Sequence, residues 1–159
     1  MDPQWSHLHR AIGPVSRRLG VVISRELAAD LRDAGRAWTP TKGDWFVIPD
    51  KGLDALEFVV SDMVIETRRM AFDRQLLAFN GTTEWAMDTL AASEALWLPR
   101  EDQLRAVLGE AFMRLEYIPG ETPGYAVSML LGDSEERFVD VSVEGAYARA
   151  ALALLTAVF

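Results

Sequence analysis

The sequence predicts an α+β fold, a single domain in which three or four helices pack a mainly antiparallel sheet of about five to seven strands. The length of 159 residues suits one hydrophobic core, and half of the residues are hydrophobic. Segments with apolar residues every three or four positions alternate with short β-rich runs. The short connections between neighbouring runs favour hairpins over helical crossovers.

The N-terminal segment predicts an interrupted helix. Apolar residues recur at helical spacing over residues 3–19, but Gly13 and Pro14 break the pattern. We therefore expect residues 1–22 to form a helical N-terminal extension and residues 23–159 to form the single α+β domain.

The next helix has clear start and stop signals. Ser24 is a typical N-cap, Leu27 and Leu31 mark the apolar stripe, and Gly35 suits a left-handed C-terminal stop. A meander of short strands should follow, separated by Gly, Pro, Asp and Ser. The predicted strands are residues 45–48, 58–60, 63–66 and 76–79.

The second half predicts a helix, three strands and a last helix. Asn80 and Gly81 signal a turn, and residues 83–90 fit neither the helical nor the strand period, so both remain open. Pro99 should lie in the first turn of a helix that Gly109 ends early. Ser142 should cap the last, Ala-rich helix. The predicted strands are residues 113–118, 125–131 and 137–141.

Composition argues against several classes of partner. The formal charge of −8 opposes binding to nucleic acid or to anionic lipid, since both are polyanions. No segment reaches the roughly 20 apolar residues that span a bilayer. The absence of cysteine suits a reducing compartment, so we expect a soluble, cytoplasmic protein without nucleic-acid or membrane partners.

The motifs of common catalytic and cofactor sites are missing. Neither a phosphate-binding glycine loop nor the G-x-S-x-G nucleophile turn occurs, and the acidic residues follow no metal-loop template. We therefore expect no cofactor and no metal site. Glu84 and Asp88 would share a face if their segment is helical, and they are the candidates for an acid and a base. They support the alternative function, a small-ligand-binding protein or a carboxylate-dependent hydrolase.

Tryptophan supplies the other candidate site. The chain has five tryptophans, and tryptophan is enriched in interface hot spots as well as in cores. Trp85 and Trp97 flank the unassigned segment, and Arg100 follows closely. We expect these three residues to contribute to an interaction surface. The function that this favours is a non-catalytic module that binds a protein partner or self-associates, rather than an enzyme.

Two motifs carry a resemblance to a family of small uncharacterised actinobacterial proteins. They are FNGTTEWAMD at residues 79–88 and ALWLPREDQLR at residues 95–105, and residues 23–49 and 146–155 are similar too. Some members carry the label pilus-assembly protein. The large pilus-localisation ATPase of that name needs a Walker-type loop, which this sequence lacks. The resemblance implies a shared origin and no catalytic residue.

Overall fold

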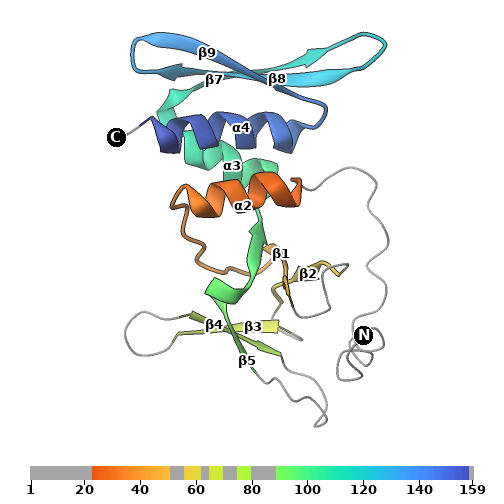
Figure 1. Cartoon of the computed structure of the whole chain (residues 1–159), viewed down its shortest axis with the longest axis vertical. Coiled ribbons are helices and arrows are strands. Elements are labelled where there is room, and N and C mark those ends of the chain that lie inside the picture. Colours follow the sequence, from red (N-terminus) through yellow and green to blue (C-terminus); the bar gives the residue numbers. More distant parts are fainter. Residues whose placement is uncertain (1–22, 51–55, 62–64, 70–74, 80–88, 158–159) are drawn as a thin grey trace. The chain divides into compact units, whose positions relative to one another are not determined.

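The computed structural model describes residues 23–50, 56–61, 65–69, 75–79 and 89–157. These ranges contain three α-helices and nine short strands, and the helices and antiparallel sheets confirm the predicted α+β class (Figure 1). None of the helices in these ranges is long and apolar enough to cross a membrane. The chain divides into two compact units, Met1–Leu19 with Trp38–Trp97 and Gly20–Ala37 with Leu98–Phe159.

The first unit contains two three-stranded sheets. Strands β1 (Trp45–Val47), β2 (Phe58–Val59) and β6 (Leu96–Leu98) form one sheet in the order β2-β1-β6, and β6 ends where the second unit resumes. Strands β3 (Ile65–Arg69), β4 (Gln75–Phe79) and β5 (Thr89–Ala91) form the other. A 3-10 turn, η3 (Ala92–Glu94), follows β5.

Aromatic side chains pack together within the core of the first unit, which also contains buried aliphatic residues. Phe46 is fully buried, and its ring lies 5.5 Å from the ring of Trp38 and 5.4 Å from that of Phe58. The buried carboxylate of Asp44 accepts hydrogen bonds from the Trp38 indole N–H at 2.9 Å and from the backbone N–H of Thr41 at 2.9 Å. These donors compensate the cost of burying a charge, because an unpaired carboxylate in the core would be strongly destabilising.

Two helices of the second unit begin and end at recognisable caps. Helix α2 (Arg25–Asp33) confirms the predicted signals, since Ser24 Oγ accepts the Leu27 N–H at 3.3 Å and Gly35 has φ +89°. Helix α3 (Glu101–Leu108) begins two residues after Pro99, with Arg100 at the N-cap position, and it ends at Gly109, with φ +52°, before the turn η4 (Gly109–Ala111).

The rest of the second unit is an antiparallel sheet with one helix packed along it. Strands β7 (Phe112–Ile118), β8 (Gly124–Leu131) and β9 (Ser134–Asp140) lie in that order, and helix α4 (Val143–Thr156) follows. Ser142 caps α4 as predicted, with its Oγ accepting the Gly145 N–H at 3.0 Å. Helix α4 contacts β8 and β9 on one side and α2 and α3 on the other (Figure 1).

Seven of the nine described strands overlap predicted runs. Strand β5 includes Thr89 and Leu90 of the segment that was left open between helix and strand, and β6 was not predicted. Both have three residues, which is too short for a period to emerge. The distribution of the strands over three sheets was also not predicted. The expected N-terminal extension, residues 1–22, lies outside the described residues, as do residues 83–88 of the segment 83–90 whose type was left open.

Candidate functional site

The residues singled out by the sequence are placed only in part. Glu84, Asp88 and Trp85 lie outside the described residues. Trp97 is half-buried in β6, and its ring stacks on that of Trp38 at 6.5 Å with an interplanar angle of 5°. Its indole therefore extends the aromatic core of the first unit, and its role as an interaction contact stays a prediction.

Arg100 organises the start of α3. Its backbone N–H donates to Gln103 Oε1 at 3.0 Å, and its guanidinium Nε donates to Asp102 Oδ1 at 3.1 Å. The first contact is half of a capping-box arrangement, which satisfies a backbone group that the helix leaves unpaired. These hydrogen bonds give Arg100 a structural role at the start of α3. Its role as an interaction contact also stays a prediction.

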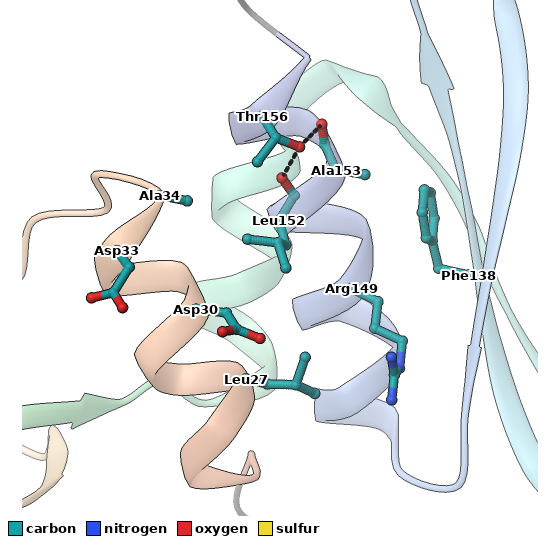
Figure 2. A pocket seen from close by; sticks show the side chains of 9 residues that line it. All are labelled: Leu27, Asp30, Asp33, Ala34, Phe138, Arg149, Leu152, Ala153 and Thr156. Carbon is teal, nitrogen blue, oxygen red and sulfur yellow. Dashed lines mark hydrogen bonds between the residues drawn. The ribbon is translucent and has the colours of Figure 1, made fainter.

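A groove lies between α2 and α4 in the second unit (Figure 2). It has a volume of about 670 Å³ and is widely open to solvent. Acidic side chains of α2 lie on one side, and α4 and Phe138 of β9 lie on the other. Its lining residues are Leu27, Asp30, Asp33, Ala34, Phe138, Arg149, Leu152, Ala153 and Thr156.

Most polar groups of the groove already have partners. Arg149 Nε donates to Asp140 Oδ2 at 2.8 Å, and Asp33 Oδ1 accepts from Arg32 Nε at 2.9 Å. The Thr156 hydroxyl donates to the Leu152 carbonyl of its own helix at 2.9 Å (Figure 2). In the described part of the chain, no group of three or more His, Cys, Asp or Glu residues could hold a metal ion. The groove therefore offers apolar surface rather than an assembled acid–base pair.

Asp140 joins β9 to the start of α4. Besides Arg149, it accepts the Ser142 backbone N–H at 3.1 Å and the Ser142 hydroxyl at 3.2 Å. Burial raises the pKa of Asp140, but the hydrogen bonds from Arg149 and Ser142 outweigh burial and hold the pKa below its ordinary value. Gly145 packs against this carboxylate so closely that a Cβ there would overlap Asp140 and Ser142. These contacts form a corner between β9 and α4, and they hold the start of α4 against the end of β9.

The exposed apolar side chains gather on the sheet of the second unit. Six large hydrophobic side chains among the described residues are exposed, and all belong to β7, β8, β9 or the residue after β9. They are divided between the two faces of this sheet, because Leu130 and Val139 lie on the face opposite to that of Leu115 and Tyr117. Neighbouring exposed apolar side chains on one face are typical of interaction surfaces, whereas single ones are common on monomers. The six are Met113, Leu115, Tyr117, Leu130, Val139 and Val141.

Strand β7 carries three of the six. Leu115 lies opposite Val127 and Tyr117 opposite Tyr125, so both project from the same sheet face as these β8 residues. Val127 is fully buried, whereas Leu115 is 36% exposed and Tyr117 is 60% exposed. Helix α4 contacts β8 and β9. Leu115 and Tyr117 thus form an exposed apolar surface on β7, on the same sheet face as Val127.

The backbone of β7 is also open on one side. In the strand order β7-β8-β9, β7 is an edge, and it makes no backbone hydrogen bond to a described residue outside β8. The other edge, β9, is protected by the consecutive charges of Glu135, Glu136 and Arg137, a usual defence against unwanted pairing. We define the β7 edge as the side of Phe112–Ile118 that faces away from β8 and pairs with no described strand, together with the side chains of Met113, Leu115 and Tyr117.

Charged side chains cross the opposite sheet face. Arg114 contacts Glu135 at 2.6 Å and Glu116 at 3.4 Å, and Arg137 Nε reaches Glu116 at 3.5 Å. The hydrogen bond and attraction to Glu135 raise the pKa of the Arg114 guanidinium. All four side chains are between 40% and 48% exposed, so these ion pairs contribute little to stability. One positive and one negative charge of this network, Arg114 and Glu116, belong to β7 itself.

Ser128 lies beneath this charged network, opposite both Arg114 and Arg137 in the register. It is fully buried, and its hydroxyl has no hydrogen-bond partner among the described residues. A buried hydroxyl without a partner loses its hydration with no compensation.

We therefore expect the Ser128→Ala chain to be more stable than the wild type, by up to about 1 kcal/mol in the free energy of unfolding. Urea unfolding followed by circular dichroism measures the change. Ser134→Ala, at an exposed position of β9, is the control and should leave the free energy unchanged. A loss of stability in Ser128→Ala would show that the hydroxyl has a partner in solution.

The β7 edge was missed at the sequence level, although its signal is present. Residues 113–117 alternate apolar and charged side chains, as a strand with one face in water does. The alternation indicates a strand but does not show that the strand is unpaired on one side. Comparison with family models, with curated proteins and with solved structures finds no match, so the resemblance to small actinobacterial proteins stays a prediction.

Proposed function

We propose that this chain is a cytoplasmic, non-catalytic protein-interaction module that binds its partner along the β7 edge. The observation that carries the proposal is that β7 combines a backbone side with no partner among the described residues and three exposed apolar side chains. An added strand would take up the free N–H and C=O groups, and pockets for alternate side chains would give specificity.

The surrounding surface is consistent with strand addition at this edge. The β9 edge is shielded by charge, so pairing is directed to β7. A β-bulge between Phe112 and Arg114 disturbs only the start of β7, and residues 114–118 keep a regular register with β8. The regular part thus offers a five-residue template to a partner strand.

Site-specific crosslinking in cells tests the proposal. The photo-reactive residue p-benzoylphenylalanine is introduced at Tyr117 in the full-length chain, and the adducts formed on irradiation are analysed by mass spectrometry. We expect a defined adduct from position 117, because Tyr117 is 60% exposed beside the unpaired edge.

The matched control carries the same photo-reactive residue at Asp133, an exposed position in the turn between β8 and β9. We expect this control to give no defined adduct. If position 117 yields only the adducts found at position 133, or none, then the β7 edge is not an interaction site and the proposal is wrong.

A further inference from the structure

We infer that the partner strand at the β7 edge is β7 of a second copy of this chain, paired antiparallel about a two-fold axis at Leu115. This inference rests on the proposed function and names its partner. In such an isologous interface, the same residues serve both sides, so each contact occurs twice. The strand sequence must therefore complement itself when it is reversed.

The charges of β7 select one register. A two-fold axis perpendicular to the sheet passes between two copies of one residue, because directly opposed residues share a sheet face. An axis at Arg114 or at Glu116 would place identical charges against each other. An axis at Leu115 instead places Arg114 of each copy opposite Glu116 of the other. Only this central register pairs opposite charges, and it gives the longest overlap of the seven-residue strand.

The apolar side chains fit the same register. Leu115 of each copy lies at the axis, and Met113, the residue at the β-bulge, lies across from Tyr117 of the second copy. These three side chains are 36% to 60% exposed in the single chain. Pairing therefore covers six exposed apolar side chains in two chains, and burial of apolar surface is the main favourable term in association.

The resulting assembly closes at two copies. Pairing would join the two sheets into six strands in the order β9-β8-β7-β7-β8-β9, whose outer edges are both β9. Since β9 carries charged residues at positions 135, 136 and 137, these edges resist further addition. The structure thus points to a dimer rather than to a filament.

The decisive experiment is charge reversal on the two sides of the axis. The variants Arg114→Glu and Glu116→Arg each turn both opposite-charge pairs into like-charge pairs. We expect the wild type to show a concentration-dependent dimer by sedimentation velocity, and each variant to need at least about a tenfold higher concentration to dimerise.

An equimolar mixture of the two variants is the matched control. In a mixed dimer, one β7 strand carries glutamate at positions 114 and 116 and the other carries arginine at both, so the two cross-strand pairs are again attractive. Contacts within each chain are the same in the mixture as in the separate variants. A recovery of the dimer therefore arises only from contacts between chains, and circular dichroism verifies that both variants fold.

Two results would overturn the inference. One is a wild type that remains monomeric at every concentration up to about 1 mM, the weak limit of specific association. The other is a mixture that dimerises no better than the separate variants. Crosslinking at Tyr117 distinguishes this failure from a failure of the proposed function. If the adduct contains a different protein and no second copy of this chain, the β7 edge is still an interaction site but its partner is not a second copy.

Discussion

Replacing Phe46 by alanine is expected to lower the free energy of unfolding by about 3–5 kcal/mol. Phe46 is fully buried in β1, between the rings of Trp38 and Phe58. Truncation removes its buried apolar surface and leaves a cavity that two further rings line. Because Trp38 also stacks on Trp97, the loss should spread through the aromatic core of the first unit.

Urea unfolding followed by tryptophan fluorescence measures this effect. The described tryptophans, Trp38, Trp45 and Trp97, all belong to the first unit, so the signal reports on the unit that carries the substitution. Phe46→Leu is the control, because it retains most of the apolar volume and should cost about 1 kcal/mol. Equal effects of the two variants would contradict the packing described for Phe46.

The second large effect is expected at the corner between β9 and α4. Asp140→Ala should lower the free energy of unfolding by about 2 kcal/mol at neutral pH, since hydrogen bonds to charged groups are stronger than neutral ones. The change removes the acceptor of Arg149 and of both Ser142 donors. The Arg149 side chain is 50% exposed and stays hydrated, so we expect less than the loss from breaking a fully buried pair.

The effect of Asp140→Ala should depend on pH. The folded-state pKa of Asp140 lies below its ordinary value of 3.8, so its ionised form stabilises the fold above about pH 3.8. That stabilisation is lost as the pH falls through the folded-state pKa. The difference between wild type and variant, measured by thermal unfolding from pH 7 to pH 2, should therefore shrink at the acidic end.

Asp133→Ala is the matched control for this series. Asp133 is exposed in the turn between β8 and β9, and its removal should change the free energy of unfolding by less than about 0.5 kcal/mol. A pH-independent difference for Asp140→Ala would mean that packing against Gly145, rather than the charge of the carboxylate, is what the corner requires.

The candidate site shows where sequence reasoning reached its limit. The alternation of Met113, Arg114, Leu115, Glu116 and Tyr117 predicts a strand, and β7 confirms it. Whether a strand is central or at an edge depends on which strands pair with it, and long-range pairing leaves little trace in the local pattern. The same pattern would suit a central strand with one face in water. The candidate interaction surface could therefore be identified only from the order of the strands.

Caps and periods predicted the helices well, because both are local. Ser24 and Ser142 cap their helices through bonds to residues three positions ahead, and Gly35 and Gly109 supply the positive φ that ends α2 and α3. The start of α3 was predicted less well. Pro99 was expected in the first turn, but Arg100 takes the N-cap position and Pro99 precedes it. The Gln103 side chain accepts a hydrogen bond from the Arg100 backbone N–H.

By itself, the sequence determined the α+β class, the three described helices and most of the strands, since these follow from propensities and spacing over a few residues. Only the tertiary structure decided that the described strands form three sheets, that Trp97 stacks on Trp38, and that one side of β7 pairs with no described strand. The physical reason is that pairing and packing join residues distant in the chain. Their energies depend on which surfaces meet, and no local pattern encodes that choice.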